Sequence, residues 1–128
     1  MNNITKEELV NKAREAKERS YSPYSSFAVG AALLCKDGSV YLGTNVENVS
    51  FGATCCAERT ALFSAIANGA REFEAIAISA TKNPCYPCGI CRQVLAEFCK
   101  KDFKFYIDGE DATEEKSLDE LLPCSFDF

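Results

Sequence analysis

The sequence predicts an α/β fold in three layers, with helices on both faces of a sheet. Apolar residues recur at helical spacing in three segments, and four shorter segments have the apolar runs or alternation of strands. These segments follow one another in the order α, β, β, α, β, α, β, which is typical of a sheet covered by helices. The chain has 128 residues, 47% hydrophobic and 26% charged, so we expect residues 1–128 to form one domain.

A capping box and a hairpin turn mark the first half of the chain. Thr5 followed by Glu8 has the spacing of a capping box, so the apolar run after it predicts a helix over residues 6–19. Further along, Asp37-Gly38 is typical of the bend between two strands of a hairpin. We expect those strands at 28–35 and 40–45.

Helices and strands alternate in the second half. Apolar residues at helical spacing predict helices over 55–68 and 89–101, and Asn68-Gly69 is typical of a helix C-terminus. Short apolar runs predict buried strands over 74–80 and 103–107.

Charge and the absence of histidine narrow the possible functions. The formal net charge of -5 argues against binding to nucleic acid or to an anionic membrane surface, and it favours a small-molecule substrate. Histidine is absent, so histidine-based triads and histidine-ligated metals are excluded. Any transition-metal site must therefore use thiolates, and proton transfer must fall to a carboxylate, Lys, Tyr or Cys.

The eight cysteines are fewer than a disulfide scaffold of this length would carry. The first residues lack the apolar region of a signal peptide, so we expect reduced thiols and a cytoplasmic location. No apolar run approaches the ~20 residues needed to cross a bilayer, and we expect no membrane association.

Three of these cysteines have the spacing of a metal site. Cys56 opens one predicted helix with Glu58 two residues later, and Cys88-x-x-Cys91 opens another. Helix N-termini favour thiolates because of the partial positive charge there. Three thiolates would leave one zinc position open for water, as in catalytic sites, and Glu58 could then transfer a proton.

The spacing leaves alternatives open. The run from Cys85 to Cys91 also begins an iron-sulfur motif, although that motif needs a cysteine where the chain has Leu95. A structural zinc site with four thiolates could take Cys55 or Cys85 as its extra ligand. Glu58 would then be only a favourable charge at a helix start.

Polar and aromatic side chains near these motifs are candidate ligand contacts. Asn45 and Glu47 share one face of a strand end and could bind a hydroxylated ligand, although a solvated strand end explains them equally well. Phe27 closes a hydroxyl-rich connector, and from spacing alone core packing is its more frequent role.

The two cysteine motifs together have the form of the zinc deaminase signature, C-x-E with P-C-x-x-C. The chain resembles the cytidine deaminase family of the small homotetrameric type, from near its N-terminus to Phe126. The matching segments are Tyr21-Ser22-Pro23-Tyr24-Ser25-x-Phe27-x-Val29-Gly30-Ala31-Ala32-Leu33, Asn45-x-Glu47-Asn48, Cys56-Ala57-Glu58-Arg59-Thr60-Ala61, Pro87-Cys88-Gly89-x-Cys91-Arg92-Gln93-Val94 and Leu121-Leu122-Pro123-x-x-Phe126.

This resemblance implies a three-layer α/β/α cytidine deaminase-like fold with a central mixed sheet. It also implies zinc-dependent deamination of cytidine and deoxycytidine, with release of ammonia, in a homotetramer whose sites lie between subunits. The implied roles are zinc binding by Cys56, Cys88 and Cys91, proton transfer by Glu58, ribose binding by Asn45 and Glu47, base contact by the Ala57 backbone, ring packing by Phe27 and a neighbouring subunit's Phe126, and hydrogen bonding of the ligand sulfurs by Arg59.

The chain departs from the family pattern in two places. Phe51 stands where the family often has Tyr, so we expect one substrate hydrogen bond to be missing, a loss of ~0.5–1.5 kcal/mol in affinity. Cys85 creates a second Pro-Cys-x-x-Cys, but the Gly-x-Cys-Arg-Gln match favours Cys88 and Cys91 as ligands. The remaining thiols, Cys35, Cys55, Cys99 and Cys124, are expected to be structural or incidental.

Two other functions remain possible from the sequence. One is deamination of another aminopyrimidine nucleoside, such as blasticidin S. The other is a thiolate-zinc binding module without catalysis.

Overall fold

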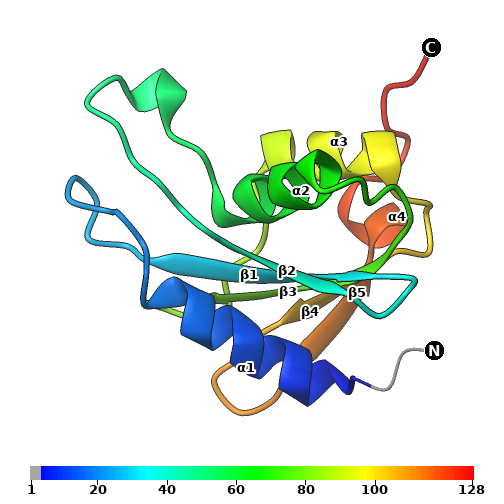
Figure 1. Ribbon diagram of the computed structural model, residues 1–128, viewed down its shortest axis with the longest axis horizontal. Coiled ribbons are helices and arrows are strands. Elements are labelled where there is room, and N and C mark those ends of the chain that lie inside the picture. Colours follow the sequence, from blue (N-terminus) through cyan, green and yellow to red (C-terminus); the bar gives the residue numbers. More distant parts are fainter. Residues whose placement is uncertain (1–3) are drawn as a thin grey trace.

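The computed structural model describes residues 4–128, which build a five-stranded mixed sheet with the strand order β2-β1-β3-β4-β5 (Figure 1). β1 pairs antiparallel with β2 and β3, β3 pairs parallel with β4, and β4 pairs antiparallel with β5. The strands are β1 (Val29–Cys35), β2 (Val40–Thr44), β3 (Phe73–Ala80), β4 (Lys104–Ile107) and β5 (Glu114–Ser117). The helices are α1 (Lys6–Lys17), the 3-10 helix η1 (Phe51–Ala53), α2 (Ala57–Ala67), α3 (Gly89–Phe98) and α4 (Leu118–Leu121).

The helices cover both faces of the sheet, so the expected three-layer α/β/α architecture is confirmed. α1 lies on one face, and α2, α3 and α4 lie on the other (Figure 1). Alternate residues of each strand supply the two cores, because successive side chains point to opposite faces. Leu33 and Ile76 pack against α2 and α3, whereas Leu34 and Ala77 pack against α1.

All seven expected elements are present, with small differences at their ends. The capping box of Thr5 and Glu8 is formed, but α1 ends at Lys17 instead of residue 19. α2 begins at Ala57, two residues later than expected, because Cys56 is its N-cap. α3 ends at Phe98 instead of residue 101.

The sequence pattern missed β5 and α4. β5 has the sequence Glu-Glu-Lys-Ser and forms an edge of the sheet, where charged side chains discourage pairing with another chain. Such a strand has no apolar alternation to reveal it. The short α4 begins at a capping box made by Ser117 and Glu120, a signal that the sequence does carry.

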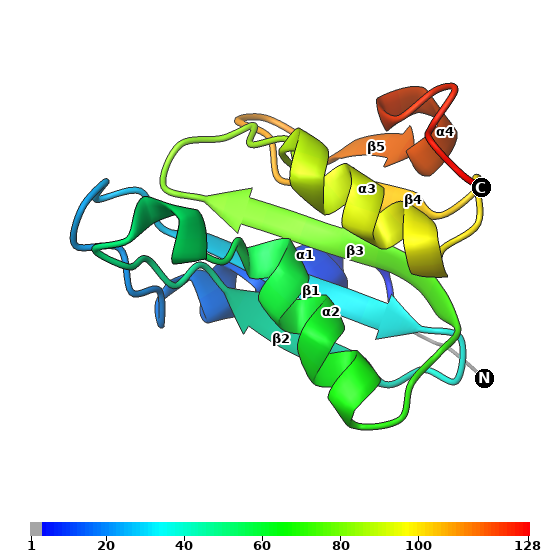
Figure 2. The ribbon, with the colours of Figure 1, turned by 90° about the horizontal axis from the view of Figure 1, so that it is seen from above.

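Three loops that bear candidate site residues leave the same end of the sheet (Figure 2). They are the segments 18–28, 45–56 and 81–88. An isolated bridge between Val46 and Tyr21 joins the first two, and a second bridge pairs Val46 with Cys55 within the second loop. The N–H of Thr81 donates to the carbonyl of Ala28 over 2.8 Å, which joins the third loop to the first.

None of the helices in residues 4–128 has the length and apolar content needed to span a bilayer.

Candidate metal and active site

Three thiols converge where α2 and α3 begin. Cys56 is the N-cap of α2, Cys88 is the N-cap of α3, and Cys91 lies in the first turn of α3. Their sulfur atoms all lie within 4.8 Å of one another, and the Sγ atoms of Cys56 and Cys88 are 3.9 Å apart. Ligand sulfurs about 2.3 Å from a tetrahedral zinc are about 3.8 Å from each other, so the arrangement fits zinc.

Arg59 and the helix ends favour negative charge on this cluster. The Nη2 of Arg59 donates to Cys56 Sγ over 3.3 Å, while its Nε is buried without a partner among residues 4–128. A hydrogen bond from Cys91 and the nearby Arg59 lower the pKa of Cys56 to about 5, and the same bond raises the pKa of Cys91. The cluster is therefore prepared to bind a cation.

Glu58 lies beside the three thiols in the first turn of α2. Its side chain is buried, with only 4% of the residue exposed. Burial raises the pKa of Glu58 to about 7, because a charged carboxylate is poorly solvated there. A carboxyl group with such a pKa can both accept and return a proton near neutral pH.

The other two cysteines of the motifs stand outside this group. Among residues 4–128, the sulfurs that converge are those of Cys56, Cys88 and Cys91, without Cys55 or Cys85. Burial raises the pKa of Cys55, and it raises that of Cys85 to about 11. This geometry favours a site with three thiolates over one with four, and it favours Cys88 and Cys91 over the register that uses Cys85.

The loop before α3 is fastened by residues that sequence reasoning did not assign. Arg92 Nε donates to the carbonyl of Pro87 over 2.8 Å, and its Nη1 donates to that of Leu121 over 2.7 Å. The hydroxyl of Tyr86 donates to Glu114 Oε1 over 2.6 Å. These contacts connect the loop before Cys88 to β5 and α4. Because the sequence pattern did not reveal β5 or α4, it could not predict that Arg92 and Tyr86 hold this loop.

Asn45 is buried at the end of β2 and organises the Phe27 segment. Its Nδ2 donates to the carbonyl of Phe27 over 2.8 Å. Its Oδ1 accepts from the N–H of Val29 over 2.9 Å and from the hydroxyl of Ser20. One N–H of the amide remains for a ligand.

Glu47 follows on the same extended segment and binds the neighbouring loop. Its Oε1 accepts from the N–H groups of Tyr24 (2.9 Å) and Ser25 (3.1 Å), and its Oε2 accepts from the Ser25 hydroxyl. These bonds, that of the Ser25 hydroxyl first, hold the pKa of Glu47 below its usual range. The three residues line a cavity of about 370 Å³ together with Phe51 and Thr54.

Aromatic candidates occupy two separate places. Phe27 is half-buried and lies next to Ala28, which contacts the Thr81 loop. Phe51 packs edge to face on Tyr24, with ring centroids 5.8 Å apart, and carries no hydroxyl for a substrate. Phe126 lies on the C-terminal tail and is 71% exposed.

The backbone of Ala57 is fully buried at the start of α2.

Comparison with known proteins agrees with this geometry. The model of the cytidine and deoxycytidylate deaminase zinc-binding region matches residues 3–107. A cytidine deaminase of Halalkalibacterium halodurans is 53% identical over 120 residues, which cover 92% of this chain and 91% of that protein. One from Sporosarcina psychrophila is 47% identical over 122 residues, covering 94% and 90%.

A solved structure has the same fold. The crystal structure of cytidine deaminase from Burkholderia pseudomallei superposes with a TM-score of 0.92 at 46% identity, covering 96% of this chain and 100% of that one. The three converging thiols, the buried carboxyl group beside them and these likenesses lead to one conclusion. The chain belongs to the cytidine deaminase family of zinc-binding deaminases.

Proposed function

We propose that this protein catalyses the zinc-dependent hydrolysis of cytidine and deoxycytidine to uridine and deoxyuridine, with release of ammonia. The observation that carries the proposal is the position of Glu58, a buried carboxyl group at the same helix start as the thiol of Cys56. A thiolate site that served structure alone would have no use for such a group. The family supplies the substrate class, since the relatives compared above are cytidine deaminases.

Glu58 moves the protons of the reaction. A zinc ion held by Cys56, Cys88 and Cys91 would supply Lewis-acid activation of a water molecule. The carboxylate of Glu58 accepts one proton from that water as its oxygen adds to C4 of the base, and it delivers this proton to N3. It then takes the remaining hydroxyl proton and gives it to the amino group, which leaves as ammonia while the C4–O double bond forms. Water and cytidine are consumed, uridine and ammonia leave, and Glu58 returns to its starting state.

The remaining site residues hold the nucleoside. Asn45 and Glu47 bind the ribose hydroxyls, and the backbone of Ala57 contacts the base. Phe27 packs on the pyrimidine ring. The role of Glu47 is supported by the cavity that it lines with Tyr24, Ser25, Phe51 and Thr54, whose volume of about 370 Å³ is within the range of small-ligand pockets.

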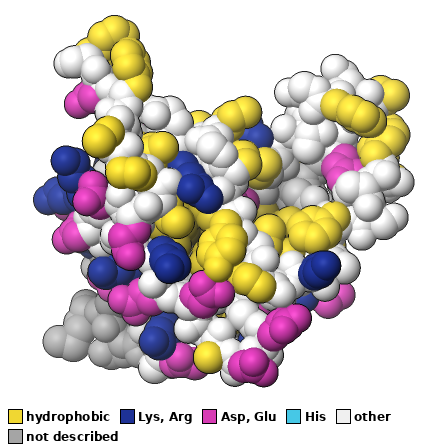
Figure 3. Space-filling model, turned by 180° about the vertical axis from the view of Figure 1, so that it is seen from behind, with side chains coloured by type: hydrophobic (Ala, Val, Ile, Leu, Met, Phe, Trp, Pro, Cys, Tyr) yellow, Lys and Arg dark blue, Asp and Glu magenta, His cyan; other side chains and the backbone are white. Residues whose placement is uncertain are grey.

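Phe126 acts across a subunit boundary in a homotetramer. Hydrophobic side chains gather on two projections of the surface, the loop between β2 and α2 and the C-terminal tail (Figure 3). Exposed aromatic side chains of this kind are typical of protein interfaces. The most exposed large hydrophobic side chains among residues 4–128 are Val49, Phe51, Phe126 and Phe128, of which all but Val49 are aromatic.

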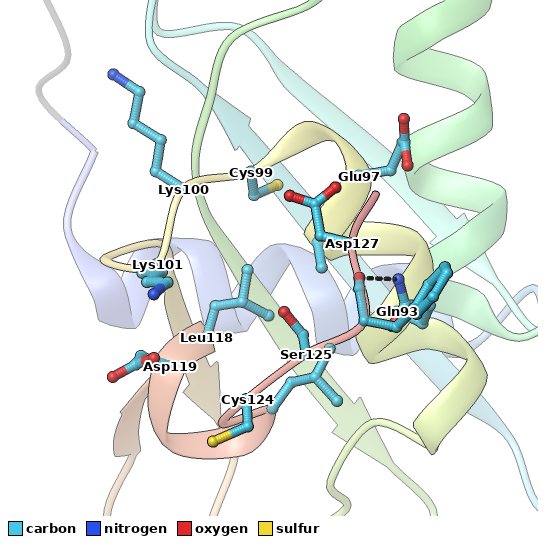
Figure 4. Close-up of a pocket in the computed structure, with 13 residues that line it drawn as sticks. Gln93, Glu97, Cys99, Lys100, Lys101, Leu118, Asp119, Cys124, Ser125 and Asp127 are labelled. Atoms are coloured by element: carbon cyan, nitrogen blue, oxygen red, sulfur yellow. Dashed lines mark hydrogen bonds between the residues drawn. The ribbon is translucent and has the colours of Figure 1, made fainter.

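The tail does not reach the cavity beside Glu47 in its own chain. Instead it packs along α3, where Gln93 Nε2 donates to the carbonyl of Phe126 over 3.4 Å (Figure 4). There it covers a groove of about 620 Å³ that also involves α4 and contains none of the zinc cysteines. In its own chain the Phe126 ring packs edge to face on Phe128, with ring centroids 5.4 Å apart. Its place outside the zinc site of its own chain supports a contact with the site of another subunit.

The cellular setting follows from the reaction. Free nucleosides are recovered inside the cell, so we place the protein in the cytoplasm, in pyrimidine salvage, with residues 1–128 acting as one catalytic domain. Reduced thiols at the metal site suit that compartment.

Incubation of the purified protein with cytidine tests the function. We expect uridine and ammonia in equal amounts, with one zinc per chain in the same sample. Deoxycytidine, deoxycytidylate and blasticidin S are assayed in parallel. A preference for blasticidin S would favour the alternative that the protein deaminates another aminopyrimidine nucleoside. Zinc without turnover of any of these compounds would favour a binding module and contradict the proposal.

A further inference from the structure

A buried carboxylate on the opposite side of the sheet contacts the loop that delivers Cys88. Asp108 follows β4 directly and is only 5% exposed. Its two oxygens accept from Arg14 of α1, over 2.7 Å from Nη2 and 2.9 Å from Nε. Oδ2 also accepts from the hydroxyl of Ser79 on β3 over 2.7 Å and from Nδ2 of Asn83 over 3.4 Å.

Asn83 connects this cluster to the zinc loop, which we define as residues 81–88. Its Oδ1 accepts from the N–H of Ala80, the last residue of β3, over 2.9 Å. This bond bends the chain away from the sheet at the point where the zinc loop begins. Asp108 thus holds the side chain of Asn83, which fixes the direction in which the zinc loop leaves β3.

Asp108 is itself fixed by the sheet and by α1. Its N–H donates to the carbonyl of Ile78 over 2.9 Å, which extends the pairing of β4 with β3 by one residue. Arg14 neutralises the buried charge, so the carboxylate can remain ionised in this position. A rigidly held anion of this kind is a suitable anchor for a neighbouring amide.

We propose that Asp108 is a positioning residue for the zinc loop, acting through Asn83 to hold Cys88 where it meets Cys56. Partners that hydrogen-bond a metal ligand directly change metal affinity by about 10–100-fold when they are replaced. Asn83 and Asp108 act one step further out, through the backbone of the zinc loop, so we expect an effect at the lower end of that range. The proposal rests on the zinc site described above. According to this proposal, residues on the α1 side of the sheet support zinc binding on the opposite side.

Zinc release measures this role separately from stability. The zinc-loaded protein is mixed with an excess of a chromogenic chelator, and the rate of zinc transfer is recorded for wild type, D108N and N83A. The matched control is V10A, because Val10 is buried between α1 and the sheet and touches neither Asp108 nor the zinc loop in the contacts described. Urea unfolding of each variant gives its loss of stability.

We expect D108N and N83A each to release zinc about tenfold faster than wild type. The double variant should release it no faster than the faster single variant, since both substitutions break the same connection. V10A should release zinc at the wild-type rate although it is less stable. Release at the wild-type rate by both D108N and N83A, or acceleration by V10A as large as that by D108N, would overturn the proposal.

N83A decides the question alone if D108N does not fold, because it leaves the bonds between Arg14 and Asp108 in place. The outcome is also independent of the substrate. If the protein binds zinc and fails to deaminate cytidine, the proposed function is contradicted, yet the zinc-release rates still test Asp108.

Discussion

Gly43 of β2 and Ala57 of α2 approach so closely that no side chain fits between them. A Cβ atom built on Gly43 would lie 2.3 Å from the carbonyl oxygen of Ala57 and 2.4 Å from the backbone nitrogen of Ala61. Thr60 fastens the same contact, since its hydroxyl donates to the carbonyl of Thr44 over 2.8 Å. The start of α2, with Cys56 and Glu58, therefore rests directly on the backbone of β2.

Gly43→Ala should displace that helix start. The atoms that block the new methyl group belong to the backbone, so α2 must move, and we expect unfolding free energy to fall by about 1–3 kcal/mol. Cytidine turnover and zinc affinity should fall with it, because Cys56 moves relative to Cys88. Gly52→Ala is the matched control, as nothing lies within 4 Å of its new Cβ. Equal activity in the two variants would refute the argument.

Arg59→Gln should weaken zinc binding without unfolding the protein. The guanidinium donates to Cys56 Sγ and offsets the negative charge of three thiolates. Competition with a chelator should show an affinity loss of about 10–100-fold. If the variant binds zinc as tightly as wild type, Arg59 has no part in supporting the cluster.

Replacing single cysteines should separate ligands from bystanders. We expect Cys88→Ser and Cys91→Ser to lose zinc, whereas Cys85→Ser and Cys55→Ser keep one zinc per chain, because only the former belong to the converging group. Elemental analysis of the purified variants measures the metal content. Loss of zinc from Cys85→Ser would instead indicate the overlapping motif.

The stability that Asp108 provides should depend on pH. Burial alone would raise its pKa, but hydrogen bonds from Arg14 and Ser79 outweigh burial and hold the pKa below its usual range. The charged form therefore stabilises the fold above the unfolded pKa, near 4, and this contribution disappears as pH falls through the folded value.

Urea unfolding of zinc-stripped wild type and D108N measures this effect. We expect wild type to be more stable by about 1–3 kcal/mol at neutral pH, since the bonds to Asp108 are charge-assisted. The difference should begin to shrink below about pH 4, where Asp108 of the unfolded chain takes up a proton, and it should disappear as pH falls through the lower folded value. A difference that stays constant into acid would contradict the assignment.

The main elements, and the positions of Cys56 and Cys88 at helix starts, could be predicted because their signals are local. The capping box predicts α1, and Asp37-Gly38 predicts the bend of the hairpin. Gly38 adopts a φ of 94° at that bend. Cys56 and Cys88 each precede a segment with apolar residues at helical spacing, so the sequence predicts both at helix starts, where the structure has them. Spacing of this kind depends only on neighbouring residues.

Contacts between distant segments could not be predicted in the same way. Arg14 and Asp108 are 94 residues apart in the chain, and nothing in either neighbourhood indicates that they pair. The polar strand β5 lacks apolar alternation, so its pairing with β4 becomes visible only in the folded sheet. The same holds for Arg92, whose partners lie on the zinc loop and on α4.

The variant Glu58→Gln tests the central claim most directly, because it keeps the shape of the side chain and removes its acid-base function. Zinc content and cytidine turnover are measured on the same preparation of wild type and variant. We predict one zinc per chain in both, with turnover by the variant reduced by at least about a hundredfold. A zinc-loaded variant that deaminates cytidine at the wild-type rate would contradict the role of Glu58 in catalysis.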